Sequence, residues 1–157
     1  MKMRAELIQQ IMANYKFLGG DLESCGVYSC SNLPYRGGYV NHPCTKWGRK
    51  SLDNIRYLYK ILICLEQEYQ FRYGPKESHS GETIKKIADW FTNTGFFAQN
   101  LPSIGFTEPE LCMPDEYKCN DPVQSYRTYY LKDKVYMNNG KRMDDWGKRG
   151  KPEWWRS

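Results

Sequence analysis

The sequence predicts a mainly α-helical protein, a single-domain bundle of four to five helices with one long irregular loop. Apolar residues recur at intervals of three and four in four segments, and Gly or Pro closes each segment. A length of 157 residues suits one domain. Within the domain 1–157 we expect a first helix (1–19), a loop (20–44), a helical core (45–140) and a Trp-rich basic tail (141–157) docked on the body.

The longest uninterrupted helical pattern runs from Ser51 to Tyr73 and contains no Gly or Pro. Ser51 can cap its start, and Gly74-Pro75 ends it. The apolar run of residues 61–65 predicts a helix that is covered on most sides. One stripe of this helix mixes apolar and polar residues, namely Asn54, Leu58, Ile61, Leu65, Glu68 and Arg72.

Polar residues on an inner stripe need partners, because burying an unpaired charge costs several kcal/mol. Glu68 and Arg72 are four residues apart and can pair with each other. Alternatively, Asn54, Glu68 and Arg72 line a ligand site. The sequence leaves both interpretations open.

The remaining elements follow in chain order. Residues 3–18 read as a helix with its apolar face inward, and Gly19-Gly20 ends it. In the loop that follows, Val27-Tyr28 and Tyr39-Val40 can form a short β-hairpin. The segment that leads into the central helix is basic, with Asp53 as its single acid, and either attracts anions or is a solvated face. Its cations are Lys46, Arg49, Lys50, Arg56 and Lys60.

Ser80 can cap a third helix of about residues 81–94, and residues 96–120 show no clear period and predict an ordered loop. Asp121-Pro122 opens a further helix to about Met137, in which Gln124 can close a capping box. Its stripe again mixes cations with apolar residues: Val123, Arg127, Tyr130, Lys134 and Met137, with Tyr126 at the edge.

Facing stripes of the central helix and the 122–137 helix would form a cationic cleft. Glu68 can pair with Arg127 or Lys134, which leaves a cation over for an anionic ligand. Tyr126 and Tyr130 would offer stacking faces to a base or sugar. The net charge of +5 and the pI of about 8.8 favour such a partner, DNA or a nucleotide. The alternative is a buried ion-pair network that fixes the register of the two helices.

Cysteine and histidine carry the other candidate chemistry. Cys25, Cys30, His42 and Cys44 are a candidate zinc set, although their spacing departs from the usual half-sites. No secretory signal is visible, so the alternative is six free thiols in a reducing cytosol. His42 and His79 are each a candidate general base or a structural residue. The longest purely apolar run has five residues, so we expect no membrane span.

From residue 41 onward the chain resembles a family of small, uncharacterised helical proteins from tailed-phage genomes. The matching stretches are Asn41-His42-Pro43-Cys44 with Trp47, Ser51 and Asn54; Glu68-Tyr69 with Arg72-Tyr73-Gly74; His79-Ser80; Met113-Pro114-Asp115-Glu116-Tyr117-Lys118; Asp121-Pro122-Val123 with Tyr126-Arg127 and Tyr129-Tyr130; Lys134; Trp146; and Pro152-Glu153-Trp154. The resemblance implies a phage protein that acts in the cytoplasm of the bacterial host, where DNA and nucleotides are common targets.

In that family a segment containing Asp-Lys-His leads into the first helix. This sequence starts near the end of that segment, so an activity that depends on it would be lost here. A more remote likeness is to the helical pyrimidine-dimer DNA glycosylases of phages, which are also small and basic with a Trp- and Tyr-rich end. It implies DNA as the substrate class; their amino-terminal Thr nucleophile has no counterpart in Met1-Lys2.

Two functions are therefore expected. In the first, the protein acts on DNA or a nucleotide: Arg72, Arg127 and Lys134 bind phosphate, Tyr126 and Tyr130 stack, Glu68 orients the cations or acts as a base, and His42 and Asn54 border the site. Any reaction would be cleavage or exchange at a nucleoside bond. In the second, a non-enzymatic counter-defence protein sequesters a nucleotide signal or binds a host protein.

Overall fold

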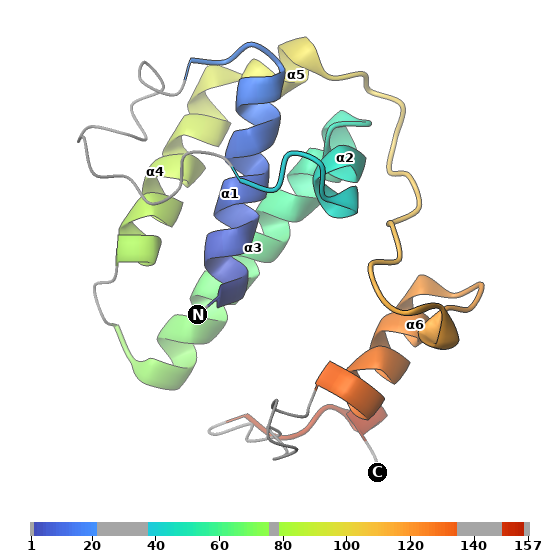
Figure 1. Cartoon of the computed structure of the whole chain (residues 1–157). Coiled ribbons are helices and arrows are strands. Elements are labelled where there is room, and N and C mark those ends of the chain that lie inside the picture. Colours follow the sequence, from blue (N-terminus) through green and yellow to red (C-terminus); the bar gives the residue numbers. More distant parts are fainter. Residues whose placement is uncertain (1, 22–37, 76–78, 135–148, 156–157) are drawn as a thin grey trace. The chain divides into compact units, whose positions relative to one another are not determined.

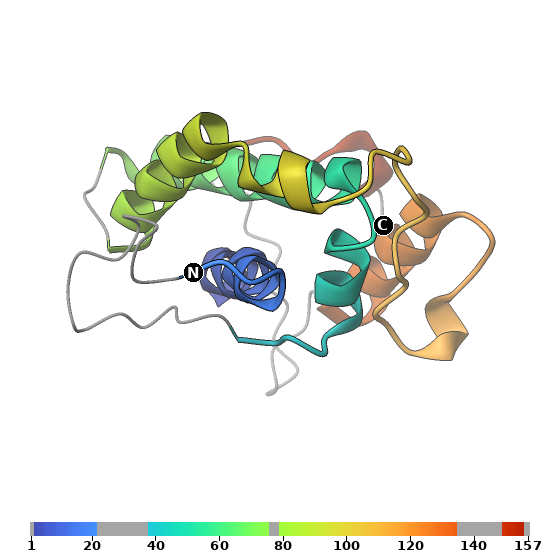
Figure 2. The same ribbon diagram turned by 90° about the horizontal axis from the view of Figure 1, so that it is seen from above.

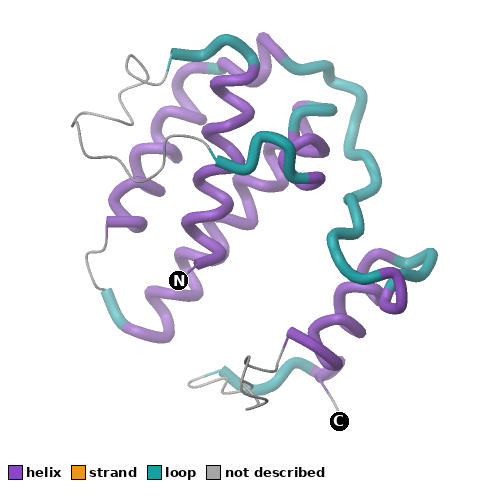
Figure 3. Tube along the Cα trace, viewed as in Figure 1, coloured by secondary structure: helices purple, strands orange, loops and turns teal. Residues whose placement is uncertain are grey.

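The computed structural model describes residues 2–21, 38–75, 79–134 and 149–155. These residues form helices and loops, and none of them lies in a strand (Figure 3). The predicted mainly α class is confirmed. Contacts divide the chain into two compact units, Met1–Glu108 and Pro109–Ser157. The boundary between the units falls inside the segment 45–140 that the sequence predicts as one helical core. None of the described helices has the length and apolar character needed to cross a membrane.

The first unit contains three long helices that pack against one another and alternate in direction (Figure 1). They are α1 (Lys2–Phe17), α3 (Leu52–Tyr73) and α4 (His79–Thr94). The short helix α2 (Pro43–Gly48) packs on α1 and α3, and α5 (Phe96–Asn100) packs on α3. In the view along α1, α3 and α4 lie on one side of α1 and α2 lies on another (Figure 2).

The core of this unit is formed by apolar residues from all five helices. Its fully buried members are Ile8, Ile11, Met12, Ile55, Leu62, Ile84 and Ile87, and around them lie Tyr15, Trp47, Leu52, Leu58, Phe97 and Leu101. Each buried branched side chain contributes about 1.5–3 kcal/mol relative to its exposed state. The first and third helices bury the apolar positions that their spacing predicts.

The buried face of α3 is rotated from the predicted stripe. Ile55, Leu58 and Leu62 are buried, whereas Ile61 and Leu65 are only half-buried. Cys64 is exposed, so the run 61–65 is not covered on most sides. The physical reason is that α1, α2, α4 and α5 leave one long stripe of this helix facing solvent.

The ends of α3 follow the predicted signals. The Ser51 hydroxyl accepts a hydrogen bond from the Asn54 backbone N–H at 3.1 Å and caps the first turn. Gly74 follows the last turn with φ +81°, a conformation that a side chain disfavours, and its N–H donates to the Gln70 carbonyl.

Three local predictions are wrong. α4 begins at His79, so Ser80 lies inside the helix and does not cap it. Residues 96–120 contain α5 and a 3₁₀ turn, η1 (Asp115–Tyr117), and are not one continuous loop. Tyr39 and Val40 are not in a strand, and Tyr39 has φ +62°. Their predicted hairpin partners Val27-Tyr28, and Cys25 and Cys30 of the candidate zinc set, lie outside the described residues.

The second unit is built on α6 (Pro122–Tyr129), which continues into a π-helical turn, η2 (Tyr130–Lys134). The Asp121 carboxylate caps α6 by accepting hydrogen bonds from the N–H groups of Val123 and Gln124. The Gln124 side chain contacts Thr128 instead of closing the predicted capping box. In the tail, Trp155 of η3 (Glu153–Trp155) is buried, and Trp146 lies outside the described residues.

Polar groups are buried where α1 meets α2. A Cβ on Gly48 would lie 2.6 Å from a methyl of Leu58 and 3.0 Å from Nδ2 of Asn14, so the close approach of α2 requires glycine. Asn14 and Thr45 are fully buried, and neither the Asn14 amide nor the Thr45 hydroxyl has a hydrogen-bond partner among the described residues. Buried groups of this kind each cost about 1–3 kcal/mol.

Replacing Thr45 by Val should therefore raise the free energy of unfolding by about 1 kcal/mol, because the shape is kept and an unsatisfied hydroxyl is removed. Urea denaturation followed by circular dichroism measures the change. Thr92→Val is the matched control, since this exposed hydroxyl donates to the Ala88 carbonyl at 2.9 Å and its loss should change stability little. Destabilisation by Thr45→Val would contradict the assignment of an unsatisfied hydroxyl.

Candidate functional site: an aromatic platform with a basic edge

Three aromatic rings from distant parts of the first unit meet at its surface. Trp47 of α2, Tyr57 of α3 and Phe106 of the 101–108 loop have ring centroids 5.2–6.0 Å apart and contact one another edge to face. Trp47 is buried, with 2% of its surface exposed, whereas Tyr57 is 43% and Phe106 is 53% exposed. We call these three residues the aromatic platform.

A buried amide fixes the loop that carries Phe106. Nδ2 of Asn54 donates to the Trp47 carbonyl at 2.9 Å and to the Thr107 hydroxyl at 2.7 Å. Its Oδ1 accepts from the Thr107 backbone N–H at 3.0 Å. The Trp47 indole N–H donates in turn to the Thr107 carbonyl at 3.2 Å. The N–H, the carbonyl and the hydroxyl of Thr107 thus each have a hydrogen-bond partner. These bonds fix the backbone next to Phe106.

Two further hydrogen bonds lie at the start of α3 and at the start of α2. The Leu52 backbone N–H donates to the Pro102 carbonyl at 3.0 Å, which ties the start of α3 to the beginning of the loop. His42 precedes α2, and its Nδ1 accepts a hydrogen bond from the Cys44 backbone N–H at 3.2 Å. His42 therefore caps the helix that presents Trp47, and its role as a general base stays a prediction.

Exposed cations are close in sequence to the platform residues. Lys46 precedes Trp47 on α2, and Arg56 and Lys60 lie within one turn of Tyr57 on α3; all three are exposed. We call Lys46, Arg56 and Lys60 the basic edge. The acids nearby in sequence are Asp53, which lies 3.5 Å from Arg56, and the exposed Glu108.

Arg49 is directed away from this edge. Its guanidinium donates to the Val40 carbonyl at 3.1 Å and lies 4.0 Å from the centre of the Phe17 ring. Arg49, one of the five cations that make residues 45–60 basic, thus makes a hydrogen bond and a cation–π contact within the protein. The sequence gives no sign of this difference, because the partners of Arg49 come from the first helix and from residue 40.

The predicted pairing of Glu68 with Arg72 is confirmed. Arg72 Nε lies 2.6 Å from Glu68 Oε1, and about a quarter of each side chain is exposed. Asn54 is fully buried, and the protein engages its amide oxygen and amide nitrogen, so it positions the platform and offers no surface to a ligand. That Glu68 and Arg72 line a ligand site stays a prediction.

A buried ion pair that the sequence analysis missed stabilises the same half of α3. Arg4 of α1 pairs with Glu66, and its guanidinium lies 3.7 Å from the centre of the Tyr69 ring. Gln70 donates to the second oxygen of Glu66 at 2.7 Å. Arg4 lies four residues before Ile8, on the same face as the buried apolar residues of α1, but a search for apolar positions passes over a charged residue.

The other predicted ligand-binding residues belong to the second unit. Arg127 is exposed, and its guanidinium carbon lies 5.6 Å from the centre of the Trp154 ring. Tyr130 is 37% exposed, and Lys134 is the last residue of η2. A cleft between these residues and α3 stays a prediction.

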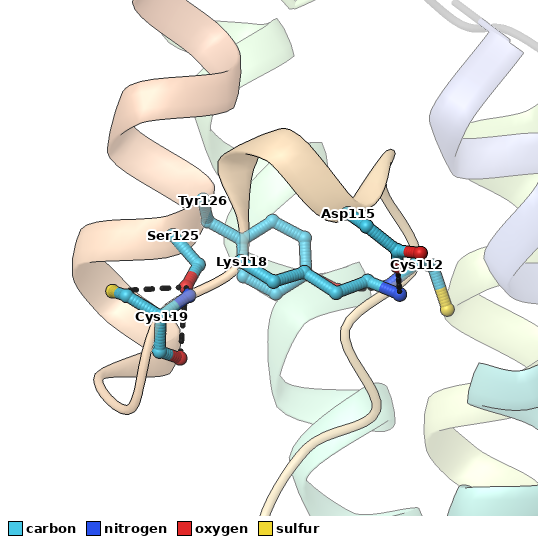
Figure 4. Close-up of polar contacts among 6 residues, drawn as sticks. All are labelled: Cys112, Asp115, Lys118, Cys119, Ser125 and Tyr126. Atoms are coloured by element: carbon cyan, nitrogen blue, oxygen red, sulfur yellow. Dashed lines mark hydrogen bonds and ion pairs between the residues drawn. The ribbon is translucent and has the colours of Figure 1, made fainter.

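Tyr126 and Ser125 attach the preceding segment to α6 (Figure 4). The Tyr126 hydroxyl donates to the Glu110 carbonyl at 2.9 Å and lies 3.5 Å from the Cys112 backbone N–H. The buried Ser125 hydroxyl accepts from the Cys119 backbone N–H at 2.9 Å. Tyr126 thus works through its hydroxyl, whereas the sequence analysis assigned its ring a stacking role.

The same view shows the Lys118–Asp115 ion pair at 2.7 Å (Figure 4). This contact lowers the pKa of the Asp115 carboxyl, first through the hydrogen bond and then through the charge of Lys118. Both side chains are more than one third exposed, so the pair adds little to stability.

The four cysteines that the structure describes, Cys44, Cys64, Cys112 and Cys119, form no disulfide with one another. Zinc binding by Cys25, Cys30, His42 and Cys44 stays a prediction, because two of the four residues lie outside the described ranges. No protein-family model matches the sequence, and comparisons with curated proteins and with solved structures found no match.

The Asn54→Ala substitution should lower the free energy of unfolding by about 2–4 kcal/mol, since the Thr107 N–H and hydroxyl lose their partner and the Trp47 carbonyl keeps only backbone donors. Amide hydrogen exchange should accelerate at Thr107 because its N–H loses its acceptor. Asn93→Ala, on the exposed surface of α4, is the control and should be nearly neutral. Unchanged exchange at Thr107 would show that the loop is held by other contacts.

Tyr126→Phe keeps the ring and removes the hydroxyl. The second unit should lose about 1 kcal/mol of stability, because the Glu110 carbonyl loses its donor. Hydrogen exchange of the Cys112 amide reports the loss directly. If exchange is as slow as in the wild type, the hydroxyl does not attach this segment to α6.

Proposed function

We propose that the protein binds a nucleotide-bearing ligand, a nucleic acid or a free nucleotide, by stacking bases on the aromatic platform and placing phosphates on the basic edge. One observation carries the proposal: two half-exposed rings lie edge to face against the buried Trp47, and Lys60 follows Tyr57 by one turn of α3.

The arrangement suits this ligand because each half of a nucleotide finds its chemical counterpart. A base stacked on an aromatic side chain contributes about 1–3 kcal/mol, and every base has a face that can stack. Lys60 lies one turn from Tyr57, so a phosphate attached to a stacked base can reach a cation. The net charge of +5 favours the approach of an anion.

The sequence analysis assigned base stacking and phosphate binding to the 122–137 helix. In this proposal, residues of the first unit have these roles. Tyr57 and Phe106 take the stacking role of Tyr126 and Tyr130, and the basic edge takes the phosphate-binding role. Asn54 remains part of the site as a positioning residue. Cleavage at a nucleoside bond, with Glu68 or His42 as a base, stays a prediction, as does the counter-defence alternative.

Truncating the platform should weaken binding without unfolding the protein. We expect Phe106→Ala and Tyr57→Ala each to raise the Kd for fluorescein-labelled octathymidylate about tenfold, which corresponds to one lost stack of about 1.4 kcal/mol. Fluorescence anisotropy at low salt measures the Kd, and circular dichroism verifies the fold.

Tyr73→Ala is the matched control for this experiment. Tyr73 is 58% exposed and lies at the far end of α3, sixteen residues beyond Tyr57. Its variant should bind as the wild type does. If neither platform variant changes the affinity for the oligonucleotide or for ATP and dTMP as competitors, the proposed site is wrong.

A further inference from the structure

We infer that the platform takes an unpaired nucleic-acid strand, with consecutive bases on its two exposed rings, and not a free nucleotide or a duplex. The inference rests on the proposed function and adds the class of ligand. It is carried by the angle between the rings, by their open exposure and by the position of the cations on α3.

The two exposed rings cannot stack on the same base. The planes of Tyr57 and Phe106 are inclined by 66°, with centroids 5.2 Å apart. A planar base that lies flat on one ring meets the other edge on. Two bases on a flexible backbone can each lie flat on one ring, so the full stacking surface is used only by two or more linked nucleotides.

The energies favour the same ligand. A free nucleotide makes one stack and one set of phosphate contacts, so it uses only part of the two half-exposed rings. A strand combines two stacks with several phosphate contacts in one binding event.

A duplex fits this surface poorly. Its bases are paired and stacked inside the helix, so their faces do not reach Tyr57 or Phe106. Duplex binding depends on many phosphate contacts. Here three edge cations stand beside the acids Asp53 and Glu108, which leaves few phosphates to be neutralised.

The exposed stripe of α3 extends the site beyond the platform. Tyr57, Lys60 and Cys64 follow one another at three and four residues and are all exposed. A strand that leaves the platform past Lys60 therefore covers the Cys64 thiol. On α2, the exposed Lys46 directly precedes Trp47 in the sequence.

Competition against labelled octathymidylate tests the ligand class, with dTMP, dT2, dT4 and a twelve-base-pair DNA duplex as competitors. Affinity should rise at least tenfold from dTMP to dT4, and the duplex should compete at least tenfold more weakly than dT4 at equal nucleotide concentration. Tyr57→Ala and Phe106→Ala should each weaken dT4 binding by a larger factor than dTMP binding, because dT4 uses both rings and dTMP uses one.

The salt dependence provides a second measurement. Three cations on a single strand give a slope of log K against log salt of about −2, and Lys60→Ala should reduce its magnitude by about 0.7. Lys85→Ala is the control, since Lys85 is an exposed cation on α4 and should leave the slope unchanged.

Alkylation of the Cys64 thiol tests whether the bound nucleic-acid strand runs along α3. Saturating octathymidylate should slow this alkylation by iodoacetamide severalfold, as measured by peptide mass spectrometry, with the exposed Cys119 as the reference thiol. An unchanged rate at Cys64 contradicts the path along α3.

The outcomes separate the two proposals. If dTMP competes as well as dT4, or the duplex competes better, and the platform variants still weaken binding, the proposed function holds and the single-strand inference is overturned. If the platform variants bind every probe as the wild type does, both proposals fail. Length dependence together with platform dependence supports both.

Discussion

The packing of α2, the start of α3 and the 101–108 loop depends on the buried side-chain amide of Asn54. One side chain joins α3 to the Trp47 carbonyl in α2 and to Thr107 in the loop; Asn54 is fully buried and Thr107 is partly buried. A buried amide without partners costs more than its hydrogen bonds contribute net, so the loop must dock for the start of α3 to be stable. The position of Phe106 is a consequence of that requirement.

The buried polar groups of this unit divide into two sets with different consequences. Ser51 and Asn54 are satisfied and fix one register between α2, α3 and the loop. Asn14 and Thr45, where α1 meets α2, have no partners among the described residues. The α2 side that faces the loop is therefore held by directional bonds, while at Gly48 α2 packs closely on Leu58 of α3 and on the Asn14 side chain of α1. The platform lies on the directional side, where positions are defined most sharply.

The sequence predicted correctly the features that depend on residues close together in the chain. Ser51, Gly74 and Asp121 marked helix ends correctly, and the four-residue spacing of Glu68 and Arg72 predicted their ion pair. Asn54 also stood out, as a polar residue on an inner stripe. Its partner was beyond reach, because Thr107 lies 53 residues away in a segment without period. Phe106 was missed for the same reason: its importance comes from a long-range contact, and no spacing rule encodes such a contact.

The fixed positions of the platform rings affect both the affinity and the specificity of ligand binding. Trp47 lies edge to face against both exposed rings, so the rings lose little conformational freedom when a ligand stacks on them, and more of the stacking free energy appears as affinity. The same geometry limits specificity. The rings present faces, which every base can use, whereas base identity is read through hydrogen bonds to base edges. We therefore propose that the platform selects a ligand with unpaired bases and linked phosphates, with little preference for sequence.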